Sequence, residues 1–268
     1  MTDQSVDVLV IGGGPGGSSA ATLLARRGYR VVLLERDRFP RDHVGESLLP
    51  ASVPVLKELG VLPLMESEGF LRKWGATMVW GRDDAPWSWY FRETNRSYPH
   101  AYQVWRPRFD QILLDNASEA GVDVREGHAV SEILWDKQTA RGVRYRTGSG
   151  DGVVDAEFLV DASGQSGVIG HSLGLRRWDT FFRNLAAYGY YRGSERLPAP
   201  DETNIFIESY QGGWTWNIPL ADGMASVGVV VDSNMAQQGI MATGLPVFFQ
   251  EQIGKSPRTS RMIANAKL

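Results

Sequence analysis

The chain has 268 residues, of which 22% are charged, and its net charge of -3 indicates no nucleic-acid partner. Cysteine is absent, which excludes disulfides, thiolate nucleophiles and iron–sulfur clusters, and the spacing of the four histidines predicts no metal site. No apolar run is long enough to span a membrane, and the polar first residues are not typical of a signal peptide. We therefore expect a cytoplasmic protein whose redox chemistry, if any, comes from an organic cofactor.

Residues 7–35 predict one βαβ unit. Residues 7–11 contain a continuous apolar run, which is typical of a buried parallel strand. A glycine-rich turn over residues 12–17 precedes an alanine-rich helix over residues 18–27, and Gly28 follows as a C-cap. Residues 30–35 predict the second strand.

The middle of the chain continues with a helical stretch to about residue 59 and a tryptophan-rich hairpin. The hairpin strands cover residues 74–80 and 87–91. A helix over residues 111–120 follows, and then short strands are expected over residues 122–124, 129–135, 142–146, 153–157 and 158–161.

The last part of the chain again has the pattern of strands, over residues 186–192, 204–210, 214–218 and 225–231. Residues 245–268 predict a helix interrupted near residues 256–257. The whole pattern predicts an α/β (α+β) fold, in which a Rossmann-like domain is interleaved with a mostly antiparallel, substrate-side β-sheet. We expect the nucleotide-binding domain over residues 1–72 and 100–178, the sheet over 73–99 and 179–245, and a helical segment over 246–268.

The glycine-rich turn has the spacing G-x-G-x-x-G. In this pattern the first glycine permits a tight turn, the second lets the backbone approach a pyrophosphate, and the third lets helix and strand pack closely. An acid at the end of the second strand is placed to bind ribose hydroxyls. The alternative is a glycine-rich turn with a surface glutamate. The segment supplies six candidate cofactor-binding residues: Gly12, Gly14, Pro15, Gly16, Gly17 and Glu35.

Three later segments add to this pattern: residues 45–47 (Gly-Glu-Ser), residues 103–106 before Phe109-Asp110, and residues 161–164 (Asp-Ala-Ser-Gly). They resemble fingerprints of the p-hydroxybenzoate-hydroxylase-like flavoproteins, and the resemblance implies FAD rather than NAD. It implies a Gly-Glu-Ser segment against the flavin ring, an arginine that reaches FAD, an aspartate near its phosphate and ribose, and a backbone contact to adenine. The alternatives are an N-cap, a helix-capping arginine, a strand-end turn and a plain strand residue. The further cofactor-binding candidates are Arg41, Glu46, Ser47, Arg106, Val130 and Asp161.

Residues 213–219 read Gly-Trp-Thr-Trp-Asn-Ile-Pro. Trp214 and Trp216 would point to the same face of a strand, and Pro219 would end its pairing. The segment resembles the G-W-x-W-x-I-P pattern of flavin-dependent halogenases at every fixed position, and simple flavin hydroxylases lack this pattern. Residues 70–77 are similar to the lysine motif of the same family, in which Lys73 is the essential lysine. The resemblance runs from about Val6 to the end of the chain and is closer to the branch that acts on phenols or tethered substrates.

The resemblance implies an FADH2-dependent halogenase of secondary metabolism that chlorinates or brominates an electron-rich, phenolic aromatic substrate, either free or tethered to a carrier protein. A separate NAD(P)H-dependent flavin reductase would deliver FADH2, and O2 and chloride or bromide would be co-substrates. Hypohalous acid would reach the substrate through Lys73, the catalytic residue. The site would be shaped by Trp214, Trp216, Ile218 and Pro219.

Two other functions stay open: an FAD-dependent aromatic monooxygenase that hydroxylates its substrate, and a non-catalytic flavin-binding fragment. In these interpretations Lys73 is a solvated surface charge, and Trp214 and Trp216 are sheet core. Members of the halogenase family are longer and carry a further Gly-Asp motif that contacts the flavin. No such motif follows Pro219, so we expect the C-terminal remainder of the family to be absent.

Overall fold

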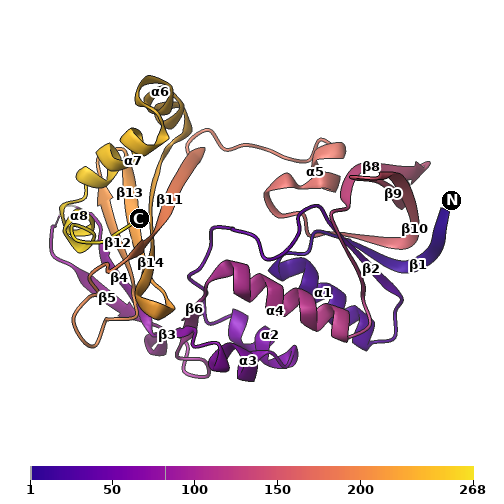
Figure 1. The fold of residues 1–268 in the computed structure, drawn as a ribbon, viewed down its shortest axis with the longest axis horizontal. Helices are drawn as coiled ribbons and strands as arrows, with labels where there is room; N and C mark the ends of the chain where they lie inside the picture. The colour runs from indigo at the N-terminus through magenta and orange to yellow at the C-terminus, as the bar shows by residue number, and fades with distance from the viewer. Residues whose placement is uncertain (1, 82) are drawn as a thin grey trace. The chain divides into compact units, whose positions relative to one another are not determined.

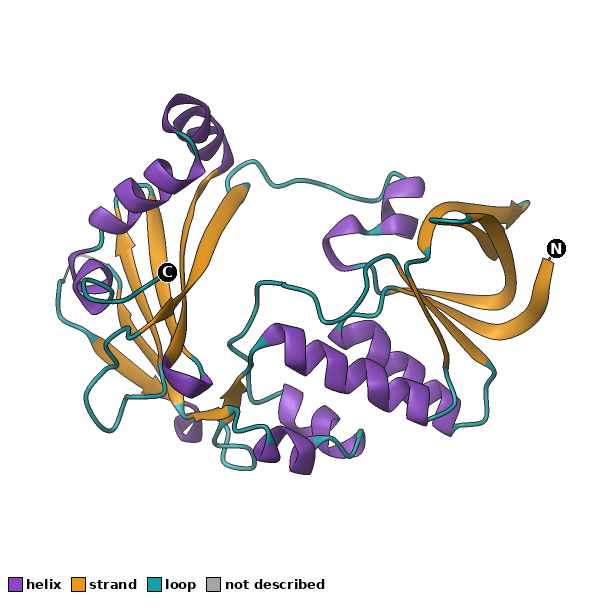
Figure 2. Ribbon diagram, viewed as in Figure 1, coloured by secondary structure: helices purple, strands orange, loops and turns teal. Residues whose placement is uncertain are grey.

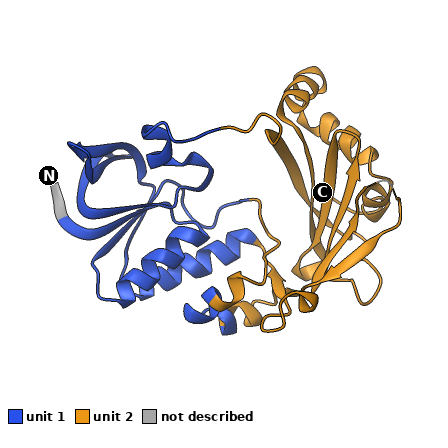
Figure 3. Cartoon of the chain, turned by 180° about the vertical axis from the view of Figure 1, so that it is seen from behind, with its two compact units in different colours: residues 1–43, 55–63, 106–177 blue, residues 44–54, 64–105, 178–268 orange. Residues whose placement is uncertain are grey.

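The computed structural model describes residues 2–81 and 83–268. The chain forms two compact units (Figure 3). Unit 1 comprises Met1–His43, Val55–Pro63 and Arg106–Arg177, and unit 2 comprises Val44–Pro54, Leu64–Trp105 and Trp178–Leu268. Among the described residues, no helix combines the length and the apolar character needed to cross a membrane.

Unit 1 is built on a six-stranded sheet in the order β7-β2-β1-β10-β9-β8 (Figure 1). β1 pairs in parallel with β2 and β10, and β2 pairs in parallel with β7, whereas β9 is antiparallel to β8 and β10. The strands are β1 (Thr2–Ile11), β2 (Val31–Glu35), β7 (Asp123–Glu126), β8 (Ala129–Asp136), β9 (Thr139–Thr147) and β10 (Gly150–Asp161). The prediction of two strands over residues 153–161 is wrong, because β10 continues through both.

Helices of unit 1 confirm the predicted βαβ unit and extend one prediction. α1 (Pro15–Arg26) connects β1 to β2. α4 (Arg106–Glu119) begins at Arg106 rather than at residue 111, since Pro107 is compatible with the first turn of a helix. α5 (Val168–Ser172) follows a short 3-10 turn, η2 (Gly164–Ser166). The remaining helices near the unit boundaries are α2 (Ser52–Glu58) and α3 (Leu62–Ser67).

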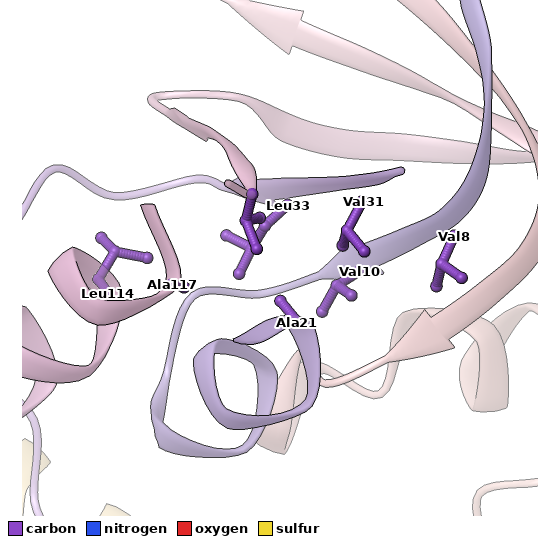
Figure 4. Close-up of a cluster of buried hydrophobic side chains, with 8 residues drawn as sticks. Val8, Val10, Ala21, Val31, Leu33, Leu114 and Ala117 are labelled. Carbon is purple, nitrogen blue, oxygen red and sulfur yellow. The ribbon is translucent and has the colours of Figure 1, made fainter. Parts of the chain in front are cut away.

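The apolar run of β1 is explained by burial on both faces of the sheet. Val8 and Val10 pack with residues of α1, β2 and α4 (Figure 4). Leu9 and Ile11 point to the other face, where they pack with residues of β8, β9 and β10. Successive side chains of a strand point to opposite faces, so a strand covered on both sides has no polar position. Burying each such side chain contributes roughly 1.5–3 kcal/mol.

Unit 2 contains a second six-stranded sheet in the order β11-β14-β13-β12-β4-β5, in which only β12 and β4 pair in parallel among the described residues. The predicted mostly antiparallel sheet and the tryptophan-rich hairpin, β4 with β5, are therefore confirmed. A two-stranded sheet joins β3 (Leu71–Lys73) to β6 (Ala101–Gln103). The strands of the large sheet are β4 (Gly75–Val79), β5 (Trp87–Tyr90), β11 (Asn184–Arg192), β12 (Ile205–Tyr210), β13 (Gly213–Pro219) and β14 (Met224–Asp232).

Three helices, α6 (Ser233–Thr243), α7 (Leu245–Gly254) and α8 (Pro257–Met262), follow the sheet of unit 2 (Figure 2). Phe249 and Ile253 of α7 pack against Val227 and Val229 of β14. The interruption between α7 and α8 is confirmed. The prediction of helix up to residue 268 is wrong beyond α8, because Lys267 exchanges backbone hydrogen bonds with Arg192 instead.

Candidate functional site

A cavity of about 690 Å³ lies in unit 1 where β1, β2 and β10 end. Ligands of open α/β sheets bind beyond the carboxyl ends of the parallel strands, so the cavity has the expected position for a nucleotide. The predicted cofactor-binding residues that line it are Gly12, Gly14, Pro15, Gly16, Glu35, Arg41, Arg106, Val130 and Asp161. Gly17 supports the loop behind it, and Glu46 and Ser47 belong to unit 2.

The glycine-rich turn is packed so tightly that two of its positions exclude a side chain. Gly12 has φ +103°, and a Cβ on it would lie 2.6 Å from the carbonyl oxygen of Ala162. A Cβ on Gly17 would lie 1.9 Å from the carbonyl oxygen of Gly12. Gly14 differs, because a Cβ there would meet only Arg41, at 3.5 Å, and would extend toward the cavity. The loop thus presents bare backbone to a ligand at the start of α1.

Glu35 holds the glycine-rich turn in place. Its carboxylate is buried, with 4% of the residue exposed, and Oε2 accepts a 2.6 Å hydrogen bond from the backbone N–H of Gly13. Oε1 accepts a hydrogen bond from the backbone N–H of Asp37 at 2.8 Å. Each carboxylate oxygen can accept a second bond, so Glu35 retains acceptor capacity toward the cavity that it lines.

Two arginines share one buried carboxylate beside the cavity. Arg106 binds Asp110 through two hydrogen bonds of 2.7 and 2.8 Å, and Nη1 of Arg41 lies 3.6 Å from the same carboxylate. The two guanidinium groups lie next to the glycine-rich turn, with the carboxylates of Asp110 and Asp37 as their ion-pair partners. Burial, together with the charges of Arg106 and Arg41, lowers the pKa of His43 in the same wall.

The residues around the cavity fit a dinucleotide such as FAD. The buried Nε of Arg41 lies 3.8 Å from a carboxylate oxygen of Asp37 but has no hydrogen-bond partner, and the Arg41 side chain lines the cavity next to Gly14. The first turn of α1 has no side-chain cap, so its backbone N–H groups are available to an anion. A phosphate would provide a hydrogen-bond acceptor both for this guanidinium group and for the helix N-terminus.

Asp161 organises the turn that closes the other side of the cavity. One carboxylate oxygen accepts hydrogen bonds from the backbone and hydroxyl of Ser163, and the other accepts from the backbone N–H of Ile169 at 2.7 Å. Burial alone would raise the pKa of Asp161, but these hydrogen bonds outweigh it and keep that pKa below its ordinary value. Asp161 therefore stays ionised and positions η2 and α5.

Lys73 is buried in unit 2 at the end of β3, with 3% of the residue exposed. Its Nζ donates a 3.2 Å hydrogen bond to the carbonyl oxygen of Leu48 and lies 5.0 Å from the centroid of the Phe91 ring. No carboxylate among the described residues forms an ion pair with it. Burial lowers the pKa of Lys73 from 10.5 to about 8.

The Gly-Glu-Ser segment lies beside Lys73 because it is added to the β3–β6 sheet. Ser47 forms an isolated antiparallel bridge with Gln103 of β6. The ammonium of Lys73 donates a hydrogen bond to the carbonyl oxygen of Leu48, the residue that follows the segment. Glu46 is fully buried, and its Oε1 accepts a 3.1 Å hydrogen bond from the hydroxyl of Tyr190 on β11. The structure therefore brings together Lys73, Glu46 and Ser47, which are far apart in the sequence.

Trp214 and Trp216 lie on one face of β13, as predicted from their parity. Their ring centroids are 5.9 Å apart, and Nε1 of Trp216 donates a hydrogen bond to Ser226 at 3.1 Å. Trp216 packs on Gly228, where a Cβ would lie 2.2 Å from the indole. Ile218 is 5% exposed, and Pro219 is the last residue of the strand, which confirms that the pairing ends there.

An aromatic series connects the tryptophans to the segment that holds Lys73. Trp216 lies 6.5 Å from Tyr188, and Tyr188 lies 5.9 Å from Tyr190, whose hydroxyl binds Glu46. Sequence reasoning missed Tyr190, because its hydroxyl binds Glu46, which is far away in the sequence. It included Gln103 in the segment 103–106 but not its pairing with the distant Ser47. The only signal for Tyr190 in the sequence is its place on a predicted strand.

The comparisons with known proteins agree with this site. The model of the FAD-binding domain family matches residues 5–188. A tryptophan 2-halogenase of Chondromyces crocatus is 37% identical over 95% of this chain and 48% of its own length. A chlorinase of Pseudomonas fluorescens that acts on a pyrrole-2-carbonyl group on a peptidyl-carrier protein is 32% identical over 86% of this chain and 56% of its own length.

Solved structures give the same result. The myxobacterial chondrochloren halogenase CndH superposes with a TM-score of 0.92 and 43% identity, covering 99% of this chain and 61% of that protein. These relatives confirm the resemblance to flavin-dependent halogenases and the predicted fold class. The chain spans about half the length of the sequence relatives described above.

Proposed function

Because the chain belongs to the FAD-binding domain family, we propose that it forms the cofactor-binding and oxidant-handling part of a flavin-dependent halogenase. The observation that carries the proposal is Lys73, a buried amine with no carboxylate partner among the described residues and a pKa lowered to about 8. A buried, unpaired lysine is costly to the fold, so its presence favours a chemical role.

In this proposal the cavity of unit 1 holds FAD. The backbone at Gly14 and the N-terminus of α1 would bind the pyrophosphate with Arg41, and Glu35 would accept hydrogen bonds from a ribose. Reduced FAD would supply the two electrons and two protons with which O2, one further proton and chloride or bromide yield hypohalous acid and water. A separate NAD(P)H-dependent flavin reductase would provide the reduced cofactor.

Lys73 would then hold and deliver the oxidant. As an ammonium it donates hydrogen bonds, and near neutral pH its lowered pKa leaves an appreciable fraction of neutral amine. Leu48 and Phe91 contact Nζ, and the buried side chain keeps the amine away from solvent. Trp214, Trp216, Ile218 and Pro219 would shape the site by filling space where a hydroxylase admits its substrate.

We propose an electron-rich, phenolic aromatic substrate, either free or carried on a protein. The aromatic side chains on the face of β13 and β11, including Tyr188 and Trp214, offer a surface on which a planar ring can stack. Two relatives described above act on tryptophan and on a carrier-bound pyrrole, which supports an electron-rich ring as the substrate class.

The test is the identity of the product. The chain is incubated with FAD, a flavin reductase, NADH, O2 and a panel of phenols and indoles, with chloride, with bromide, or without halide, and products are analysed by mass spectrometry. A halogenated product that requires the halide supports the proposal. A hydroxylated product formed without halide would establish the monooxygenase alternative, and flavin binding without any product would support a non-catalytic flavin-binding chain.

A further inference from the structure

Two buried polar atoms beside Lys73 lack hydrogen-bond partners. They are Oγ of Ser47 and Oε1 of Gln103, and Gln103 is fully buried. Lys73 Nζ carries at least two N–H bonds and uses one of them on the carbonyl oxygen of Leu48. Buried polar groups of folded proteins are almost always satisfied, so these atoms are available to bind a small polar ligand.

Backbone pairing places the Ser47 and Gln103 side chains together. The N–H of Leu48 donates to the carbonyl oxygen of Tyr102 at 3.0 Å, and the N–H of Val104 donates to that of Glu46 at 2.8 Å. These two bonds flank the bridge between Ser47 and Gln103, so the two residues form a non-hydrogen-bonded antiparallel pair. Side chains of such pairs lie on one face and approach each other closely.

The register of β3 and β6 adds Lys73 to the same face. Gln103 is opposite Leu71, and Ala101 is opposite Lys73. Because side chains alternate along each strand, Lys73 and Gln103 point to the same side of the two-stranded sheet. The hydrogen bond from Lys73 to Leu48 shows that the ammonium reaches across β6 to the segment that carries Ser47.

The orientation of the Gln103 amide is fixed by its neighbour. Nε2 donates a 3.1 Å hydrogen bond to the carbonyl oxygen of Thr203. Turning the amide over would place two oxygens against each other, so Oε1 is the atom that remains unpaired. The unpaired atom that Gln103 contributes to the face shared with Lys73 and Ser47 is therefore an acceptor.

We propose that Lys73, Gln103 and Ser47 together bind hypohalous acid, an inference that rests on the proposed function. The molecule is small and neutral, with one O–H to donate and an oxygen that accepts. Its O–H would be accepted by Oε1 of Gln103, its oxygen would accept from Nζ of Lys73, and the Ser47 hydroxyl would provide a third contact. A halide ion does not fit, because it has no proton to give to Gln103. No covalent bond forms or breaks in this binding.

Retention of the oxidant tests the site. In the reaction described above, a soluble thioether is added to capture escaping oxidant, and the ratio of halogenated product to sulfoxide is measured. We expect Gln103→Met and Ser47→Ala to lower this ratio on the order of tenfold, which corresponds to about 1.4 kcal/mol. Gln111→Met, on the exposed part of α4 where the side chain binds Asp115, is the matched control and keeps the wild-type ratio.

Thermal unfolding without cofactor supplies a second readout that needs no turnover. Ser47→Ala removes a hydroxyl that has no partner, so the unfolding temperature should not fall. A lower unfolding temperature, or a wild-type product ratio in both variants, would overturn the inference. A wild-type chain that yields neither halogenated product nor sulfoxide would instead refute the proposed function and, with it, this inference.

Discussion

Burial of Lys73 makes a quantitative prediction for the variant Lys73→Met, which replaces the amine with an apolar side chain of similar length. Lowering the pKa from 10.5 to about 8 means that the fold disfavours the ammonium by about 3 kcal/mol, at 1.36 kcal/mol for each decade. The hydrogen bond to Leu48 returns about 1 kcal/mol. We therefore expect Lys73→Met to raise the free energy of unfolding at pH 7 by about 2 kcal/mol.

The pH dependence gives the sign of the effect. Between pH 8 and 10.5 the unfolded chain binds the lysine proton and the folded chain does not, so the wild type gains stability as the pH rises. The free-energy cost of burying the Lys73 ammonium in the wild type is fully present below pH 8 and disappears by about pH 10.5. The advantage of Lys73→Met should accordingly disappear over this interval, and at pH 10.5 the hydrogen bond to Leu48 should leave the wild type about 1 kcal/mol more stable. Other titrating groups are common to both proteins and cancel in the difference.

Urea unfolding of both proteins at pH 7 and pH 10.5 measures this difference. Lys57→Met, at an exposed position of α2, is the matched control and should change stability by less than about 0.5 kcal/mol. A variant Lys73→Met that is less stable than the wild type at pH 7, or an advantage that stays constant with pH, would refute the reasoning that burial destabilises the ammonium.

Three further substitutions test the supports of the two units. Glu208→Gln removes a carboxylate that accepts hydrogen bonds from the backbone of Arg258 and from the backbone and hydroxyl of Thr259 at the start of α8. It should lower the free energy of unfolding in urea by about 2 kcal/mol. An unchanged urea midpoint would contradict this prediction. Gly228→Ala forces a methyl group into Trp216 and should cost roughly 1–3 kcal/mol, and full stability would show that the indole can move. Gly17→Ala should separate α1 from the glycine-rich turn and weaken FAD binding at least about tenfold in fluorescence titrations, and wild-type affinity would exclude the proposed cofactor geometry.

Much of the fold is predictable because the pattern of the sequence matches the pattern of burial. The apolar run of β1 reflects a strand covered on both faces, and the shared parity of Trp214 and Trp216 predicts their shared face. α6 was missed, since its polar residues and Gly239 obscure helical periodicity. Its only local signal is Asp232, whose carboxylate accepts from the N–H groups of Asn234 and Met235.

The candidate site is predictable only where its residues are local. Gly12, Gly14 and Gly17 occur in one turn, so their spacing carries the motif. Ser47 and Gln103 become neighbours through backbone pairing between distant segments, which no local pattern encodes. The depth at which Lys73 is buried likewise depends on Leu48 and Phe91, which pack around it only in the folded chain.

The central claim, that Lys73 carries halogenation, is tested most directly by the product spectrum of Lys73→Ala. With FAD, reductase, O2 and chloride, we predict a chlorinated product from the wild type and from Lys57→Ala, and none from Lys73→Ala although FAD remains bound. Chlorination that persists in Lys73→Ala at the wild-type level would contradict the account.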